Sequence, residues 1–416
     1  MARRPATQST NPAVVAALDC ITGLQTARIL AARGVPVIGV AADRHHFCAR
    51  TRAVRRVVEA PTAGDGLVAA LERLGPELVD GPAVLVPCSD ASVLAISAGR
   101  DRLDPWYRFV LPAHDVVETL VDKIRFTEYA QAHRLAIPET RILRDRRDAE
   151  AAAAELGYPA VLKPGLKTVR WQAAMKAKVF RVDSAAELLA AYDRCAAWSD
   201  ALIAQAWIDG GETDLYSANV YFDRASRPQV TFIARKIRQW PVGTGTSCLG
   251  EEVRNDEVLD ESVRLFSSVA YQGLGYLEMK RDARTGRHFI IEPNIGRPTG
   301  RSSIAERGGV ELIMTAYRDA LGQPLPEART QRYRGVKWIY LRHDLQAAIV
   351  AFRRGELSPS GWWRSVRGPK IEAVGSWRDP LPFALDAWRT LTATGGRLRR
   401  RRPARGAGTD PARVKA

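Results

Sequence analysis

Two carboxylates and one amide lie close together in two neighbouring apolar segments of the chain. GYLEMKRD, residues 275–282, contains Glu278, and HFIIEPNI, residues 288–295, contains Glu292 and Asn294. If the two segments form an antiparallel hairpin in which Asp282 pairs with His288, Glu278 stands opposite Glu292. Residues two apart on a strand share a face. The polar face is then expected to hold Glu278, Lys280, Glu292 and Asn294, and the face behind it Leu277, Met279, Phe289 and Ile291.

Facing carboxylates repel each other, or bind protons at unusually high pH, unless a cation lies between them. An all-oxygen set of this kind suits Mg²⁺, which takes one or two carboxylates and leaves its other positions to water and phosphate. The spacing therefore predicts a metal site that holds a nucleotide through its phosphates, with Glu278, Glu292 and Asn294 as ligands. The alternative is a surface hairpin whose acids are solvated.

Two lysines elsewhere fit an anionic ligand of that kind. Lys163 interrupts the apolar run PAVLKPG, residues 159–165, where a buried ammonium needs an anion. Lys123 follows Asp122 on an otherwise amphipathic helical pattern. A single lysine is usually solvated, so the predicted phosphate site depends on the combination of both lysines with the carboxylate pair.

The elements that must position these groups begin with an alternation of strands and helices. Strands are expected at 13–19, 35–43, 83–90 and 108–115, with a helix at 23–34. This alternation predicts a parallel, doubly wound sheet whose ligand-facing loops lie at the carboxyl ends of the strands. Those ends carry Asp19, Asp43, Ser89 and Asp90. A lone Gly23 stands where a dinucleotide-binding fold has GxGxxG, so NAD binding is not indicated.

A different order of elements follows after residue 115. A helix pair is expected at 116–140, two strands with a turn at 201–223 and a strand at 229–241. The last of these leads into a glycine-rich loop at 242–252. Arg235, Lys236 and Arg238 precede that loop, which would either bind an acyl phosphate and a substrate carboxylate or be a mobile surface loop.

Four segments in this order and spacing resemble the ATP-grasp carboxylate–amine ligases, and most of all the subgroup similar to D-aspartate ligase. They are VDK at 121–123, GYPAVLKP at 157–164, IAQAWIDGGE at 203–212 and the hairpin ending in FIIEPNIGR at 289–297. The resemblance implies an α/β fold that starts with a Rossmann-like pre-ATP-grasp domain. An α+β ATP-grasp domain of two subdomains that clasp ATP would follow. The implied divisions are a disordered leader at 1–10, the first domain at 11–115, the ATP-grasp domain at 116–322, a C-terminal extension at 323–394 and a basic disordered tail at 395–416.

The resemblance also implies roles for single residues. Lys123 and Lys163 would bind nucleotide phosphates, and Glu212 would bind the ribose hydroxyls. Adenine would face Gln205, Ala206, Trp207 and Ile208. The metal would be Mg²⁺ or Mn²⁺ on Glu278, Glu292 and Asn294, and the candidate catalytic residues are Arg297, Lys280 and Arg235.

Two departures from the family pattern concern the nucleotide. The segment GLKTVRWQAAMKAKVF, residues 165–180, has one glycine where the family has a glycine-rich flap, so Lys176 or Lys178 would reach the phosphates instead. Gln205 stands where many members have Glu, and either side chain offers an oxygen to an adenine amino group.

The implied function is the ATP-dependent joining of a carboxylate to an amine, with MgATP converted to ADP and phosphate. The substrates are expected to be small molecules, one of them an amino acid. The alternatives are an ATP-grasp carboxylase that uses bicarbonate and a non-catalytic nucleotide-binding protein.

Composition narrows the setting in which the protein works. Of 416 residues, 46% are hydrophobic and 26% charged, as in ordinary globular proteins, and the five cysteines form no CxxC pair. Of the net charge of +16, residues 395–416 contribute +7, because they hold eight Lys or Arg and one Asp. That tail is expected to solubilise the protein or to contact anionic surfaces, and no specific nucleic-acid motif accompanies it. The chain is expected to be cytoplasmic, and its oligomeric state does not follow from the sequence.

Overall fold

The computed structural model describes residues 11–79, 81–165, 171, 174, 175, 179–243 and 245–400, the last ten of these without their side chains. The first part of the chain forms a five-stranded parallel sheet in the order β3-β2-β1-β4-β5. Its strands are β1 (Ala13–Ala16), β2 (Val37–Ala41), β3 (Arg56–Glu59), β4 (Ala83–Pro87) and β5 (Tyr107–Arg108). Its helical segments are α1 (Ile21–Ala32), η1 (Phe47–Arg50), α2 (Gly64–Leu74), η2 (Gly75–Glu77), α3 (Asp90–Ala98) and α4 (Arg100–Leu103). The expected doubly wound parallel sheet is confirmed.

The turn from β1 into α1 requires glycine. A Cβ added at Gly23 would lie 2.4 Å from the carbonyl oxygen of Ala17 and 2.7 Å from the Cα of Leu18, both of which are backbone atoms. Ala17 and Leu18 directly follow β1 and are buried, so this backbone cannot move away to make room. This close approach brings the start of α1 to the carboxyl end of the sheet.

A second, four-stranded sheet follows, in the order β6-β9-β7-β8 with antiparallel neighbours. The expected helix pair that precedes it is α5 (His114–Val121) and α6 (Lys123–Ala132), and Asp122 caps α6 by accepting from the backbone N–H groups of Ile124 and Arg125. The strands are β6 (Thr140–Leu143), β7 (Ala160–Pro164), β8 (Phe180–Val182) and β9 (Leu202–Ala206). Helices α7 (Arg146–Glu155) and α9 (Ala185–Cys195), with η3 (Ala196–Trp198), pack on this sheet around a core of their own.

The third sheet has seven strands, in the order β14-β13-β10-β11-β12-β15-β16. Its strands are β10 (Leu215–Phe222), β11 (Pro228–Trp240), β12 (Thr246–Glu252), β13 (Gly273–Arg281), β14 (His288–Ile295), β15 (Lys337–Ile339) and β16 (Lys370–Glu372). The helical segments beside it are η4 (Glu212–Asp214), α10 (Asp256–Ser268), α11 (Ser303–Arg307) and α12 (Leu312–Ala320). The prediction of a glycine-rich loop at 242–252 is wrong over most of its length. Residues 246–252 form β12, which pairs with β11 on one edge and with β15 on the other.

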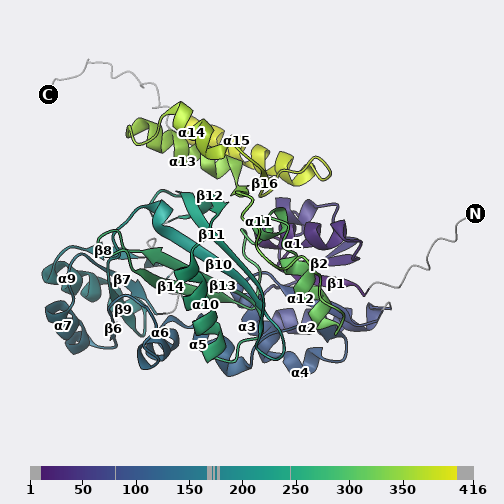
Figure 1. Ribbon diagram of the computed structural model, residues 1–416, viewed down its shortest axis with the longest axis horizontal. Helices are drawn as coiled ribbons and strands as arrows, with labels where there is room; N and C mark the ends of the chain where they lie inside the picture. The colour runs from purple at the N-terminus through teal and green to yellow at the C-terminus, as the bar shows by residue number, and fades with distance from the viewer. Residues whose placement is uncertain are drawn as a thin grey trace, which may run out of the picture.

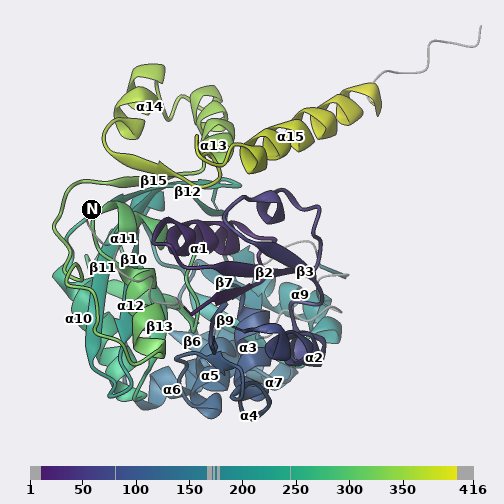
Figure 2. The ribbon, with the colours of Figure 1, turned by 90° about the vertical axis from the view of Figure 1, so that its right-hand side faces the viewer.

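The last two strands come from the C-terminal part of the chain, so that part completes the large sheet. Its helices α13 (Leu341–Arg353), α14 (Pro359–Val366) and α15 (Leu381–Arg400) lie in one layer on one side of the molecule, as Figures 1 and 2 both show. Two buried ion pairs hold this layer to the rest of the chain. Arg238 of β11 bonds Asp344 at 2.7 Å, and Arg28 of α1 bonds Asp379 at 2.9 Å. None of the described helices has the length and apolar content needed to cross a membrane.

Candidate functional site

The β13–β14 hairpin brings Glu278 opposite Glu292, as expected, but by a different register. The expected pairing of Asp282 with His288 is wrong, because Arg281 pairs with His288. A β-bulge at Ile291 then shifts the ladder by one residue and restores the Glu278–Glu292 pair. Ile291 was expected behind the hairpin, and this prediction is wrong because of the bulge. Ile290 is buried behind the hairpin instead, and Ile291 lines the cleft.

Glu278 is surrounded by charge. Its two carboxylate oxygens lie 3.4 Å from the Nζ of Lys236 and 3.6 Å from a guanidinium nitrogen of Arg301. Burial raises the pKa of Glu278 and Glu292 raises it further, while Lys236 opposes both. Burial also lowers the pKa of Lys236 and brings that of Arg301 to about 10. Both ion pairs are longer than the 2.7–2.9 Å usual for charge-assisted hydrogen bonds, so the carboxylate is not tightly bound to either cation.

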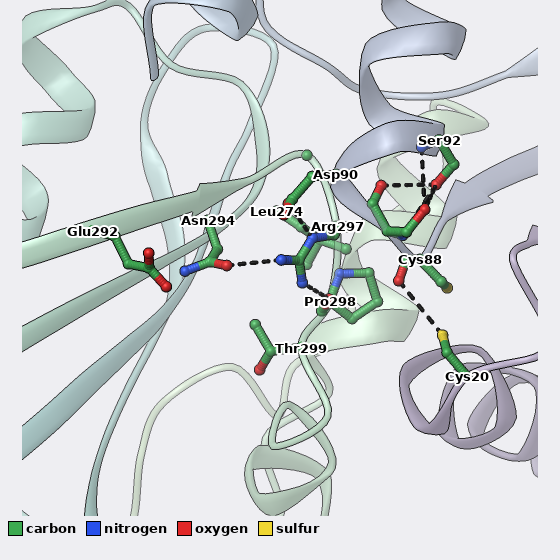
Figure 3. A network of polar contacts seen from close by, with 12 residues as sticks. Cys20, Cys88, Asp90, Ser92, Leu274, Glu292, Asn294, Arg297, Pro298 and Thr299 are labelled. Atoms are coloured by element: carbon green, nitrogen blue, oxygen red, sulfur yellow. Dashed lines mark hydrogen bonds and ion pairs between the residues drawn. The ribbon is translucent and has the colours of Figure 1, made fainter. Parts of the chain in front are cut away.

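The other two predicted ligands lie on the same hairpin. Glu292 lies 3.7 Å from the Nζ of Lys123, which begins α6. The Oδ1 atom of Asn294 accepts a hydrogen bond of 2.7 Å from Arg297. Figure 3 shows Arg297 between Asn294 and Asp90, whose carboxylate lies 2.6 Å from the guanidinium. Asp90 is the first residue of α3, so the first sheet contributes directly to this network.

These groups line a single cleft of about 610 Å³ between the second and third sheets, a volume typical of small-molecule sites. Six cationic side chains and two carboxylates line it over the described residues. They are Lys123, Lys163, Lys236, Lys280, Arg297 and Arg301, with Glu278 and Glu292. The positive excess suits a polyanionic ligand.

One end of the cleft is formed by β7 and the segment after β9. Lys163 donates a hydrogen bond of 2.9 Å to the Oε1 of Gln205, whose amide nitrogen donates to Thr140. Lys280 donates to the carbonyl oxygen of Ile208 at 2.8 Å and lies 5.1 Å from the centre of the Trp207 ring. Burial lowers the pKa of Lys280. The backbone N–H groups of Ala206 and Trp207 already bond Glu139 and Pro159.

Two predicted site residues lie away from the cleft. Arg235 lies on the opposite face of β11, where it bonds Glu251 at 2.6 Å, because successive strand residues alternate in direction. Lys236 faces the cleft in its place. Glu212 lies on η4, and its oxygens accept from the backbone N–H groups of Gln239 and Gly243. Lys176 and Lys178 lie outside the described residues.

The far end of the cleft holds residues that the sequence did not single out. Thr22 from α1, the loop 299–301, Trp338, Tyr340 and His343 line it. The guanidinium of Arg301 lies 5.2 Å from the centre of the Tyr276 ring. Among the described residues, the Tyr276 hydroxyl and the Trp338 indole N–H are buried without a hydrogen-bond partner, which is costly unless a ligand satisfies them.

The donor set fits a magnesium ion. No group of three His, Cys, Asp or Glu residues that could hold a metal occurs in the described ranges, so the protein would offer two carboxylates and one amide oxygen. Such a partial set is what Mg²⁺ uses when phosphate and water supply its remaining ligands. The loosely bound carboxylate of Glu278 is free enough to exchange its cations for a metal.

Cys248 is not placed to act as a nucleophile. All five cysteines are unpaired, and Cys248 is buried on β12. Burial raises its pKa well above the ordinary value, so the reactive thiolate is disfavoured.

Comparison with curated proteins finds ligases. The chain is 21% identical over 229 residues to the D-aspartate ligase of Enterococcus faecium, a match that covers 53% of this chain and 54% of that enzyme. It is 25% identical over 187 residues to a D-alanine–D-alanine ligase of Pseudomonas entomophila, covering 42% and 54%. The chain thus spans about half the length of these relatives. No family model matches the chain.

Solved structures of the same fold include a biotin carboxylase domain of Hydrogenobacter thermophilus in complex with MgADP, ADP and bicarbonate. It superposes with a TM-score of 0.59 at 15% identity, covering 77% of this chain and 71% of that one. The expected α/β architecture is therefore confirmed, and so is the resemblance to ATP-grasp ligases.

Proposed function

We propose that this chain, which has the ATP-grasp fold, is an ATP-dependent ligase that activates a small-molecule carboxylate as an acyl phosphate and joins it to an amine. The observation that carries the proposal is the cleft itself. Two carboxylates face each other on the β13–β14 hairpin, and six cationic side chains surround them. The cleft has more cationic than anionic side chains. A nucleoside triphosphate bound with its metal ion, together with a carboxylate substrate, would balance this positive charge.

The nucleotide would occupy the end of the cleft between β7 and β13. Its base would lie beside Trp207 and the carbonyl oxygen of Ile208, in the region of Gln205. Lys163 and Lys123 would neutralise its phosphates. Glu212 is not part of this proposed nucleotide site, because its two oxygens accept from the backbone N–H groups of Gln239 and Gly243 outside the cleft.

Glu278, Glu292 and Asn294 would hold Mg²⁺ or Mn²⁺ against the phosphates. The metal would neutralise charge on the phosphoryl group that is transferred. If Glu278 held the metal, Arg301 and Lys236 would have one anionic partner fewer in the cleft. They would then be ready to bind a second anion, which is the substrate carboxylate or the acyl phosphate made from it.

The far end of the cleft would hold the substrates. The guanidinium of Arg301 and the indole N–H of Trp338 are donors only, so they select a group that accepts hydrogen bonds. A carboxylate has this property. Arg297, oriented by Asp90 and Asn294, would stabilise charge on the phosphoryl group.

The proposed reaction has two steps, and these residues would position the reacting groups for both. A carboxylate oxygen of the first substrate attacks the γ-phosphorus, the bond to the bridging oxygen breaks, and ADP leaves. The amine then attacks the acyl carbon, phosphate leaves, and the amine loses a proton. Positioning and fixed charges supply the acceleration in such transfers, which is consistent with a cleft lined by lysines and arginines.

The test is an ADP-release screen with amino acids and other small carboxylates as pairs, with Mg²⁺ present or chelated. The expected result is metal-dependent ADP release that requires a carboxylate and an amine together. ADP release that needs bicarbonate and no amine would instead assign the chain to carboxylation, the chemistry named by the structural neighbour. Failure to bind ATP at all, measured by calorimetry, would overturn the proposal.

A further inference from the structure

The layer formed by residues 341–390 exposes most of the large apolar side chains on the described surface. Ten such side chains are exposed in the described chain, and seven of them belong to this layer. They are Leu345, Ile349, Trp363, Trp377, Leu381, Phe383 and Trp388. Trp377 is fully exposed, and Trp388 and Trp363 are 65% and 59% exposed. Concentrated exposure of this kind marks an interaction surface.

In the same layer, acidic side chains are mostly buried and basic side chains are mostly exposed. Its aspartates point inward: Asp344, Asp379 and Asp386 are buried and bond Arg238, Arg28 and Arg342. Its outward charges are almost all positive. The exposed bases are Arg353, Arg354, Arg364, Arg367, Lys370, Arg378 and Arg389, and Glu356 is the single exposed acid between residues 341 and 390.

We propose that this C-terminal surface, made of those seven apolar and seven basic side chains, docks on an anionic lipid bilayer. Tryptophan prefers the boundary between headgroups and acyl chains, where its ring is apolar and its N–H is wet. Lysine and arginine bind the negative headgroups around it. The sequence continues the same charge, because eight Lys or Arg and one Asp follow in residues 395–416. Residues of both kinds on one layer give the two signals that stable peripheral binding needs.

Two other occupants fit less well. A second copy of the chain would bring two positively charged surfaces together, which is unfavourable. A nucleic acid would engage the bases and could stack on tryptophan, but it has no use for the aliphatic side chains of Leu345, Ile349 and Leu381. Figures 1 and 2 show the layer on the outside of the molecule, and Figure 2 shows α15 extending away from the sheets.

The experiment measures binding of the full chain to vesicles by co-sedimentation. Vesicles of phosphatidylglycerol and phosphatidylcholine in equal parts are compared with phosphatidylcholine alone. The expected result is at least about tenfold tighter binding to the anionic vesicles, weakened by high salt. Brominated acyl chains in those vesicles are expected to quench the tryptophan fluorescence, because the exposed rings enter the bilayer.

The decisive variant is W363S/W377S/W388S, with Trp198→Ser as the matched control because Trp198 is an exposed tryptophan on η3, in the second sheet's subdomain. The triple variant is expected to lose about tenfold in vesicle affinity and most of the quenching, while the control binds like the parent. Circular dichroism and ADP release in the absence of vesicles check that each variant is folded. They also separate this proposal from the proposed ligase activity, which involves none of these side chains.

Several outcomes would overturn the docking proposal. Equal binding to neutral vesicles would remove the role of charge. Anionic binding that survives the triple substitution would assign it to the basic tail alone. Tighter binding to a poly(U) oligonucleotide than to vesicles would indicate a nucleic-acid partner, and a dimer at micromolar concentration that the triple substitution dissociates would indicate self-association.

Discussion

Glu278 and Glu292 stand opposite each other because Ile291 bulges out of the strand between them and the hairpin turn. Without the bulge, the observed pairing of Arg281 with His288 would place Glu278 opposite Ile291 instead. The bulge therefore sets the spacing of the two carboxylates. It also turns Ile291 into the cleft, where Ile291 is one of the apolar lining residues.

Glu292→Ala is expected to lower Mg²⁺-dependent ADP release by about 10²–10³, as loss of one preorganised charge contact commonly does. The measurement is turnover at saturating substrates over a range of Mg²⁺ concentrations. Glu251→Ala is the matched control, because Glu251 pairs with Arg235 on the opposite face of the sheet. Unchanged turnover in the Glu292 variant would contradict the metal assignment.

Trp338→Phe tests the far end of the cleft. The substitution keeps a ring in place and removes an indole N–H that has no partner among the described residues. We expect the KM of the carboxylate substrate to rise about tenfold, the value for one lost hydrogen bond to a charged group, with the KM of ATP unchanged. The ligand-free protein is expected to lose about 1–2 kcal/mol in free energy of unfolding, because the smaller ring leaves a small cavity at a buried core position. A change in the KM of ATP alone would place the nucleotide at this end.

Glu306 makes stability depend on pH. Burial raises the pKa of this carboxyl group from 4.5 to about 7, and its Oε1 accepts from the backbone N–H of Ile313. The folded state then binds the proton more tightly than the unfolded chain, so this stabilising contribution is complete below about pH 4.5 and is lost as the pH rises through about 7.

Glu306→Gln keeps the acceptor and removes the titration. Relative to the parent, the variant is expected to gain about 2 kcal/mol in free energy of unfolding between pH 5 and pH 8. Urea unfolding at both pH values measures the difference, with Glu59→Gln on the exposed end of β3 as the control. Parallel pH profiles for parent and Glu306→Gln would show that this group does not titrate in that range.

Gly23→Ala is expected to destabilise the protein by about 1–3 kcal/mol, because the new methyl group would overlap buried backbone atoms. Gly157→Ala is the matched control, because a Cβ there meets nothing within 4 Å. Thermal unfolding of the two variants compares them directly. Equal melting temperatures would mean that the β1–α1 turn relaxes more easily than the buried strand suggests.

Much of this architecture could be predicted from the sequence, because short apolar runs indicate buried strands and amphipathic patterns indicate helices. The parallel sheet, the helix pair with Asp122 between its helices, and the hairpin with Glu278 and Glu292 follow from such local patterns. Segment 246–252 did not follow, because its glycines and small polar residues resemble a loop. Pairing with β11 and β15 on both edges makes it a strand instead.

The site was harder to predict where the direction of a side chain determines whether it faces the cleft. Arg235 and Lys236 are adjacent cations, and only the position of β11 in the sheet shows that Lys236 faces the cleft. Arg301 and Trp338 carry no local signal at all, since each lies on a segment whose position depends on contacts with distant strands. Arg301 follows Arg297 by four residues in the sequence. This spacing does not predict that both side chains reach the cleft unless the conformation of the intervening turn is known.

The strand that carries Trp338, β15, follows the β13–β14 hairpin by about 40 residues in the sequence, yet Trp338 lines the cleft. A growing polypeptide therefore has its proposed metal ligands and phosphate-binding lysines long before it has a closed pocket. Any translation product that stops short of β15 leaves β12 with an open edge and the substrate end without its aromatic wall. Closure of the proposed substrate end thus depends on a strand that lies far downstream in the sequence.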